Sequence, residues 1–410
     1  MLKKYIKNIE SNKYLKIITE FSLLQFFFWS TWAIYGGYLV YYLGEIGYSN
    51  IRIGTLMSLR TFTGLIGPPV IGFICDKIES RKIVFIISMT LMGLIVAPFA
   101  FYGDYMLFAA IGIMGFLWEP QQSVLDSWII ETSDKTALNY GFMRAWGSIG
   151  FAIIVTIFGL VIELFGWTVH FLSYGFVAFI VVVIALMIED NSYQKNDDLK
   201  ADNEKDKTNL KNLMKLLKDP EYLFILFVTL LIFIPAMMIM VYLAPIVQLL
   251  GGDSRDLGYI LFFNALSEAP IFFMAKHFLQ RYKTKALLLF AAIFYLIRTI
   301  IVALAVSPTQ LIFYGLLQSL SFGVFLVTVR YYVKLIAPAG LKTTAQSIIL
   351  MSAFGAGGII GSLLGGFLID TFGMNSMFAV SIAFSLLAVI VLFISIIKKG
   401  SPKIKKNIKN

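Results

Sequence analysis

The chain consists of apolar stretches, each long enough to cross a lipid bilayer, that alternate with short polar loops. About 20 apolar residues suffice to cross the hydrocarbon core, and the sequence contains twelve such stretches. Because lipid offers the backbone no hydrogen bonds, each stretch is predicted to be a helix. The stretches are roughly 17–43, 52–76, 83–101, 105–129, 141–165, 168–189, 221–250, 256–280, 285–305, 309–334, 343–369 and 374–397.

Charged residues are too scarce to cover a water-exposed surface. They make up 14% of the 410 residues, and 59% are hydrophobic, whereas a soluble domain carries about a quarter charged residues. An all-α membrane protein is therefore expected, with most of its outer surface facing lipid. The net charge of +10 does not predict nucleic-acid binding, because the basic residues lie in tails and alternate loops rather than on one folded face.

The distribution of lysine and arginine predicts the orientation. Loops and tails on the side of the N-terminus hold 28 of the 34 basic residues, and the opposite side holds only Arg52 and Arg255. Cytoplasmic loops are enriched in such residues. Both termini are therefore predicted to be cytoplasmic.

A polar segment divides the chain after the sixth stretch. Residues 190–219 are rich in charge and poor in large apolar side chains, a composition that predicts a solvated linker. The expected organisation is an N-terminal six-helix half (1–189), a cytoplasmic linker (190–219), a C-terminal six-helix half (220–397) and a basic cytoplasmic tail (398–410).

An internal repeat supports that division. A shift of 207 residues places Gly150 on Gly357, Gly159 on Gly366, Glu163 on Asp370, and Phe165-Gly166 on Phe372-Gly373. The fifth and eleventh stretches are thus similar at their polar ends as well as in apolar composition. Two parallel halves related by an axis along the membrane normal are expected to show this pattern.

The loop after the second stretch carries a motif rather than a simple basic run. It contains Gly72, Asp76, and the pair Arg81 and Lys82. This spacing resembles the signature loop of the major facilitator superfamily. The resemblance implies a conformational role, in which Asp76 holds a neighbouring helix end and the basic pair anchors to the cytoplasmic interface.

Longer matches resemble one branch of that superfamily. The first stretch is similar to the opening helix of bacterial nucleoside:proton permeases, and the fifth is similar to their fifth helix. These matches carry Leu24-Gln25-Phe26, Trp29, Trp32, Arg144-Ala145-Trp146-Gly147 and Gly150-Phe151.

Two more segments resemble parts shared by nucleoside, lactose-type and phenylpropionate permeases, and with them the resemblance spans the whole chain. It implies a twelve-helix fold with a central cavity between two halves, and transport of a small solute with protons. The segments carry Ser267-Glu268, Phe272-Phe273, Arg298, Ala337-Pro338 and Thr344-Ala345-Gln346-Ser347.

The tenth stretch departs from the pattern of these families. Lactose-type permeases carry a histidine and a glutamate there, and nucleoside permeases carry an aspartate. This chain has Gln318, Ser321 and Gly323. The proton site of those families therefore cannot be transferred to this stretch.

Ionisable residues inside the stretches are the strongest site candidates, because each costs at least about 2.5–3.5 kcal/mol to insert. They are Glu20, Glu119, Asp126, Arg144, Glu268, Arg298 and Arg330, with Arg60 near an outer end.

Asp126 and Arg144 are expected to bind the solute, and a purely structural ion pair is the alternative. Gly147 and Gly150 would let another helix approach Arg144 closely. Glu119 and Asp126 share a helix face with Gln122 between them. The resemblance implies the same pair, because lactose-type permeases join an acid at this point to the fifth-helix arginine to bind sugar hydroxyls.

Glu268, with Arg298, is the candidate proton carrier, and direct solute contact is the alternative. Gln25, Trp29 and Trp32 recur at i, i+4 and i+7 on one helix face, so they can form a platform for a nucleobase or sugar ring. Helix packing is an equally good explanation for them. Gln318 is expected to add polar lining.

The sequence predicts no cofactor, metal site or enzyme chemistry. Cys75 is the single cysteine, and His170 and His277 have no companion ligands near them. The glycines of the eleventh stretch lie in an apolar helix with no preceding strand, so they predict close packing rather than a phosphate cradle.

The expected function is import of a small hydroxylated solute by proton symport through alternating access. A nucleoside comes first and a sugar second. The alternatives are an efflux transporter of the same fold and a sensor on a transporter scaffold, which would need a larger cytoplasmic domain. A monomer in the bacterial cytoplasmic (inner) membrane is expected.

Overall fold

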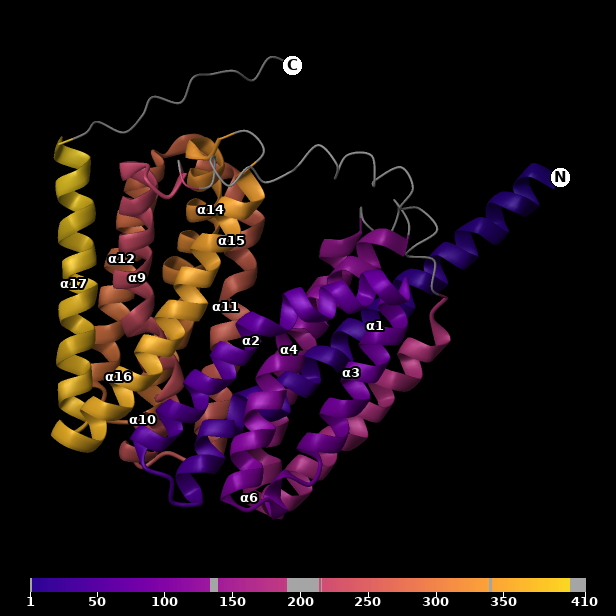
Figure 1. The fold of residues 1–410 in the computed structure, drawn as a ribbon, viewed down its shortest axis with the longest axis horizontal. Coiled ribbons are helices and arrows are strands. Elements are labelled where there is room, and N and C mark those ends of the chain that lie inside the picture. Colours follow the sequence, from indigo (N-terminus) through magenta and orange to yellow (C-terminus); the bar gives the residue numbers. More distant parts are fainter. Residues whose placement is uncertain (1, 133–138, 190–213, 215, 339–340, 399–410) are drawn as a thin grey trace.

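The computed structural model describes residues 2–132, 139–189, 214, 216–338 and 341–398. Every regular element in these ranges is helical (Figure 1). The first elements are α1 (Leu2–Glu45), α2 (Asn50–Ile78), α3 (Arg81–Val96), η1 (Phe99–Phe101), α4 (Asp104–Thr132) and α6 (Tyr140–Met187). After the linker come α9 (Pro220–Val241), α10 (Leu243–Leu249), α11 (Ser254–Arg281), α12 (Thr284–Leu304), η2 (Pro308–Gln310), α13 (Leu311–Leu316), η3 (Ser319–Gly323), α14 (Val324–Ile336), α15 (Lys342–Leu350), η4 (Met351–Ala356), α16 (Gly357–Phe372) and α17 (Met374–Lys398).

Eight helical stretches in the described residues are long and apolar enough to cross a membrane. One of them, α6, has 48 residues and changes course at Gly166, whose φ of 73° and ψ of −178° are not helical. The helix α3 is short, with 16 residues. The helices α4 and α11 have 29 and 28 residues, but polar side chains interrupt them. The eight are Tyr14–Glu45, Asn50–Ile78, Tyr140–Met187, Pro220–Val241, Thr284–Leu304, Pro308–Ile336, Thr344–Phe372 and Met374–Ile397.

Side chains cap the first turns of the helices that follow short connecting turns. Ser49 accepts a hydrogen bond from the amide of Arg52 at the start of α2, and Ser80 accepts one from Ile83 at the start of α3. Asp253 forms a capping box with Asp256 at the start of α11. These caps satisfy amides that the first helical turn leaves without partners, so the turns can stay short.

Of the predicted linker, residues 190–213 and 215 lie outside the described residues, as does the predicted basic tail after Lys398. Asp219, the last linker residue, caps α9 by accepting from the amides of Glu221 and Tyr222. The C-terminal part of the chain therefore resumes as a helix where the sequence places the end of the linker.

The 207-residue repeat has a counterpart in the geometry. Gly166 and Gly373, which are 207 positions apart, have φ values of 73° and 85°, a region that favours glycine. The hydroxyl of Tyr38 donates to the carbonyl of Val155, and that of Tyr242 donates to the carbonyl of Ser362 at 2.7 Å. Val155 and Ser362 are again 207 apart, so a tyrosine hydroxyl binds the equivalent carbonyl in each part.

The N-terminal and C-terminal parts meet at one end of the molecule, which we call the junction end. Figure 1 shows the two groups of helices converging there and the marked chain ends at the opposite end. The carboxylate of Asp370 accepts from the amides of Asn50 at 3.1 Å and Ile51 at 2.7 Å. A second contact between the two parts places Arg255 Nε 2.5 Å from Glu163 Oε2.

The two parts also share apolar core residues at the junction end. One cluster of buried side chains combines residues of the N-terminal part with residues of the C-terminal part, such as Tyr242, between α9 and α10, and Leu257 of α11. A second cluster contains only residues between Leu216 and Leu392. The two parts therefore share a core at the junction end, and the C-terminal part keeps its own core elsewhere.

Asp370→Asn is expected to loosen the junction end. The carboxylate of Asp370 accepts hydrogen bonds from two backbone amides of the other part, and such charge-assisted bonds are among the strong ones. The neutral amide of asparagine makes weaker bonds. A cysteine at Thr61, which faces Gly358 of α16, would report this in a Cys75→Ala background. We expect several-fold faster maleimide labelling of that cysteine.

Asp104→Asn is the matched control, because Asp104 binds Tyr48 and Arg52 within the N-terminal part. It should leave the labelling rate unchanged. Equal rates in the Asp370 variant and the parent would contradict a closing role for Asp370.

Candidate substrate-binding site

Gln25 connects three of the predicted site residues. Its Nε2 donates to Asp126 Oδ1 at 3.4 Å, and its Oε1 accepts from Trp29 Nε1 at 3.0 Å. Gln25 is fully buried, so its amide holds both partners in place. The amide thus orients the carboxylate of α4 and the indole of α1 toward the same space.

Arg144 lies against the indole of Trp29, with its Cζ 3.9 Å from the ring centroid. A guanidinium in this position is attracted by the ring's electron-rich face. The approach depends on two glycines of α6. A Cβ on Gly147 would lie 2.4 Å from Trp29 Cδ1, and one on Gly150 would lie 2.4 Å from the carbonyl of Phe26. As the sequence predicts, another helix, α1, passes close by Arg144.

Asp126 and Arg144 attract each other without direct ion-pair contact in the described residues. The phenol of Tyr140 lies close enough to both groups to couple with them electrostatically. Sequence reasoning missed Tyr140. The available signal was its position one helical turn before Arg144, which places both on one face of α6.

In the C-terminal part, Glu268 and Gln318 form the polar contact between α11 and the tenth stretch. Gln318 Nε2 donates to Glu268 Oε1 at 3.0 Å. The five residues after Gln318, Ser319–Gly323, form a π-helical turn, a feature that often marks functional positions in helices. The contact therefore joins an acid of α11 to an amide at the start of this turn.

Arg298 is held by neutral groups rather than by Glu268. It donates from Nε to the carbonyl of Tyr314 at 2.9 Å and from a terminal nitrogen to Ser321 Oγ at 2.9 Å. A longer contact of 3.5 Å reaches Asn264. Glu268 attracts Arg298 electrostatically, but no ion pair joins them among the described side chains. Asn264 and Tyr314 were not candidates in the sequence.

The charged groups of the two parts are also coupled electrostatically. Glu268 of α11 attracts Arg144 of α6 as well as Arg298 of its own part. Both Arg144 and Glu268 are partly accessible to solvent, and so is Asp126. Each part of the chain thus places partly accessible charged groups on its helices.

Two further candidates, Trp32 and Glu119, lie beside a different arginine. Arg60 Cζ is 4.7 Å from the ring centroid of Trp32, and Glu119 attracts Arg60. Glu119 is exposed to solvent, and Gln122 is half-buried. The two indoles on this face of α1 therefore lie against different arginines, Trp29 against Arg144 and Trp32 against Arg60.

The remaining buried-charge candidates lie apart from these groups. Glu20 pairs with Lys16 one turn earlier on α1, at 3.7 Å. Arg330 is exposed, and its backbone carbonyl accepts a hydrogen bond from Gln346. His170 bonds the carbonyl of Ile34, and no group of three or more metal-ligating side chains occurs in the residues searched.

The family model of the MFS_1 like family matches residues 18–380, most of the chain. The chain belongs to this family. Its fold is that of a major facilitator transporter, a multi-pass membrane protein rather than an enzyme.

Relatives and solved structures agree with that assignment. The maltose permease of Geobacillus stearothermophilus is 26% identical over 387 residues, covering 92% of this chain and 94% of that protein. The sucrose permease of Escherichia coli is 23% identical, with 90% of each chain covered. The crystal structure of the nucleoside transporter NupG superposes with a TM-score of 0.78 at 17% identity, covering 93% of this chain and 99% of that one.

The loop motif of this transporter joins its helices at the end opposite the junction. Arg81 donates two hydrogen bonds, of 2.5 and 2.7 Å, to the carboxylate of Glu131 at the end of α4. Lys82 Nζ donates to the carbonyls of Leu186 and Ile188 at the end of α6. Asp76 is exposed, and a Cβ on Gly72 would meet open space. The basic pair thus holds three helix ends of the N-terminal part together.

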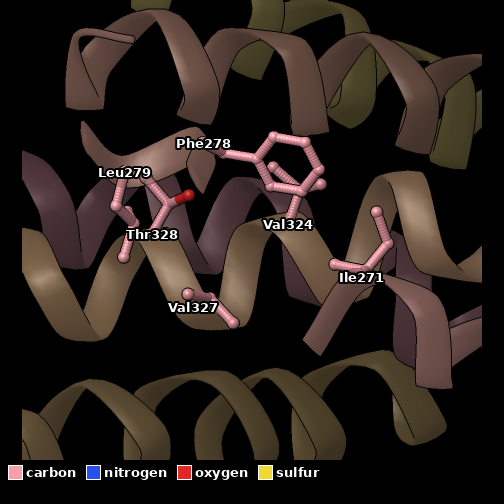
Figure 2. Close-up of a pocket in the computed structure, with 6 residues that line it drawn as sticks. All are labelled: Ile271, Phe278, Leu279, Val324, Val327 and Thr328. Atoms are coloured by element: carbon pink, nitrogen blue, oxygen red, sulfur yellow. The ribbon is translucent and has the colours of Figure 1, made fainter. Parts of the chain in front are cut away.

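A small apolar pocket lies away from these residues. It is lined by Ile271, Phe278 and Leu279 of α11 and by Val324, Val327 and Thr328 of α14 (Figure 2). Thr328 supplies its only side-chain oxygen. The pocket contains none of the predicted site residues and has no group suited to a polar solute.

Arg144→Lys is expected to weaken solute binding at least about tenfold, the effect of losing one charge-assisted hydrogen bond. Lysine keeps the charge but loses the planar guanidinium that lies over Trp29. Thermal-shift binding curves on the purified transporter, with sugars and nucleosides as probes, would measure this.

Arg52→Lys is the matched control, because Arg52 is exposed and pairs with Asp104 at the junction end. It should bind every probe as the parent does. Parent-like binding by the Arg144 variant would remove Arg144 from the site.

Proposed function

We propose that this transporter imports a small hydroxylated organic solute together with a proton, by alternating access between two six-helix halves. The observation that carries the proposal is a partly accessible acid in each half that accepts a hydrogen bond from an amide. Gln25 donates to Asp126 in the N-terminal half, and Gln318 donates to Glu268 in the C-terminal half. A solute bound between the two acids contacts both halves, so that it can couple their movement.

The proposed topology has twelve crossings. Division of α6 at Gly166, together with α3, α4 and α11, extends the eight apolar helices to that number. The basic loops favour cytoplasmic termini, which makes the junction end the outer end and the conformation inward-facing. We place the protein, as a monomer, in the bacterial cytoplasmic membrane.

The site chemistry suits hydroxyl groups. A carboxylate accepts hydrogen bonds from hydroxyls, and a guanidinium donates to them in a fixed fork. Asp126, which accepts from Gln25, and Arg144, which lies over Trp29, offer both kinds of group. Neighbouring hydroxyls on a ring can therefore replace the contacts that these side chains make with one another.

A sugar is the first candidate solute and a nucleoside the second. This order reverses the one expected from the sequence. Two relatives that align over nine-tenths of the chain are named as permeases of sugars. The likeness to the nucleoside transporter, at 17% identity, supports the fold alone.

Glu268 is the proposed proton carrier. When ionised, it attracts Arg144 across the halves and accepts from Gln318. Protonation removes its charge and with it the attraction to Arg144, so the guanidinium becomes available to the solute. Arg298 stays in place through either state, because its partners Tyr314, Ser321 and Asn264 are neutral.

Glu268→Gln is expected to abolish uptake driven by an inward proton gradient in proteoliposomes while sparing solute exchange across the membrane. The amide keeps the size of the side chain but cannot gain or lose a proton at neutral pH. Radiolabelled sugar and nucleoside counterflow would measure the exchange.

Gln318→Glu provides a complementary test, because it places an ionisable group at the end of the same hydrogen bond. Gradient-driven accumulation that survives in Glu268→Gln would exclude Glu268 as the carrier. Failure of every sugar and nucleoside to respond to the gradient in the parent protein would exclude symport itself.

Efflux of lipophilic cations is less consistent with the site. Such a solute is drawn to acids that no arginine balances. Here Asp126 lies beside Arg144, Glu119 beside Arg60 and Glu268 beside Arg298. The balanced charges favour a neutral polar solute.

A further inference from the structure

Two π-helical turns interrupt consecutive helices of the C-terminal part. The first, η3 (Ser319–Gly323), directly precedes α14, and the second, η4 (Met351–Ala356), directly follows α15. A π-turn breaks the regular hydrogen-bond ladder of a helix, and sharp bends in helices often occur at such turns. The helices α14 and α15, which we call the flap, therefore each have a bendable joint at one end.

The two joints lie side by side. The ring of Phe322 in η3 contacts the ring of Phe354 in η4, with centroids 6.1 Å apart. Both rings also contact the ring of the buried Phe233 of α9, at 6.5 and 5.3 Å. Farther along the flap, Gln346 of α15 donates to the carbonyl of Arg330 of α14 at 3.4 Å, and Figure 1 shows the two helices next to each other. The flap can therefore bend about one axis as a unit.

The equivalent helices of the N-terminal part carry no such joints. A shift of 207 residues places η3 on residues 112–116 of α4 and η4 on residues 144–149 of α6. Both of these segments continue as regular α-helix. Of the two equivalent helix pairs, only the pair in the C-terminal part is thus built to bend at these positions.

One side of the flap borders unfilled space. The pocket in Figure 2 lies between α11 and α14, and Val324, Val327 and Thr328 line it from the flap. Gly323, the last residue of η3, packs against Ile271 of α11, where a Cβ would approach Cγ2 to 3.1 Å. The helix α14 therefore has room to shift against α11 just beyond its joint.

Hydrogen bonds to the first turn of α9 hold the flap in the present conformation. The buried hydroxyl of Tyr222 donates to the carbonyl of Ala345 of α15 at 2.8 Å. The hydroxyl of Tyr332 of α14 donates to the carboxylate of Glu221, which also pairs with Lys285 of α12 at 2.6 Å. Both helices of the flap are thus attached to the start of α9.

The first joint is bonded to the proposed proton site. Gln318, directly before η3, donates to Glu268 at 3.0 Å. Ser321, within η3, accepts from Arg298 at 2.9 Å. A change of charge at Glu268 therefore acts on the residue that precedes the joint.

We propose that α14 and α15 form a flap that bends at η3 and η4 and closes over the proposed solute site, while the rest of the C-terminal half keeps its shape. Closure at the end opposite the junction then combines local bending with the movement of whole halves. Phe233 is a positioning residue that keeps the two joints on one axis. This inference rests on the proposed function, in which that end opens and closes.

The test measures distances between two spin-labelled cysteines by pulsed electron paramagnetic resonance. The purified full-length transporter is studied in lipid nanodiscs without solute, and every variant carries Cys75→Ala. Lys334→Cys labels the flap, and Ile397→Cys labels α17 in the rest of the C-terminal half; both positions are exposed. The 13 residues of α14 span about 20 Å, so a bend of about 20° moves the far end of the helix by about 7 Å.

Tyr222→Phe combined with Tyr332→Phe removes both hydrogen bonds from the flap to α9. We expect the distances between positions 334 and 397 to gain a second population, shifted by about 7 Å from the parent value. Lys342→Cys, at the exposed start of α15, should show the same shift in place of Lys334→Cys, because the two helices move together.

Two further variants sharpen the test. Phe233→Ala, added to the double variant, should make the shifts at positions 334 and 342 differ, because it removes the ring that both joints share. Tyr259→Phe is the matched control. Tyr259 is an exposed tyrosine of α11, and its loss of a hydroxyl should leave the parent distances unchanged.

The outcomes separate the flap from the proposed function. Lys77→Cys, at the exposed end of α2, paired with Ile397→Cys, reports movement between the halves. If that distance changes in the double variant while the one from position 334 to 397 does not, the halves move as rigid bodies; the flap is overturned and alternating access stands. Unchanged distances in both pairs overturn the flap as well.

The proposed function fails on a different measurement, namely the absence of gradient-driven uptake of any sugar or nucleoside by the parent protein. If the double variant does not fold, Tyr222→Phe alone decides the question. It removes the bond to α15, and the distances from position 342 to 397 should then broaden toward the shifted value. A distribution identical to that of the parent overturns the flap.

Discussion

The tertiary structure of this transporter depends on close contact between helix backbones. In lipid the hydrophobic effect does not drive helices together, so dispersion contacts at small residues must do so. A Cβ on Gly150 would lie 2.4 Å from the carbonyl of Phe26, and one on Gly115 would lie 2.2 Å from that of Arg60. The first contact joins α1 to α6 and the second joins α2 to α4, the pairs that position Arg144 and Arg60.

The positions of the charged groups follow from these contacts. With α1 close to α6, the indole of Trp29 reaches Arg144. With α4 close to α2, Glu119 comes to lie beside Arg60. Each guanidinium is then held by an indole and by a nearby acid, without a direct ion pair. Contacts of this kind can be exchanged for solute hydroxyls at little cost, which a tight buried salt bridge would not allow.

At the junction end, by contrast, acids bind their partners directly. Asp370 receives backbone amides of α2 directly, and Glu163 contacts Arg255 at 2.5 Å. These acids are exposed to water at the helix ends, so their bonds can break and re-form with solvent. Glu163 and Asp370 are 207 residues apart, so they are equivalent positions of the repeat. Each binds a group of the other half.

The sequence by itself determined most of the helical spans and the candidate charges. Their lengths follow from the thickness of the hydrocarbon core, and charges inside an apolar stretch are conspicuous because they are costly. It also determined the repeat, since Gly166 and Gly373 need the same unusual backbone. It placed Gln25, Trp29 and Trp32 on one helix face because the helical period is local.

Only the tertiary structure decided which groups meet. Arg144 lies over Trp29, Arg60 lies over Trp32, and Arg298 is held by Tyr314, Ser321 and Asn264 instead of by Glu268. Helical periodicity tells which side chains share a face. It does not tell which neighbouring helix that face meets, because this depends on how closely glycine-lined backbones approach at positions far apart in the sequence.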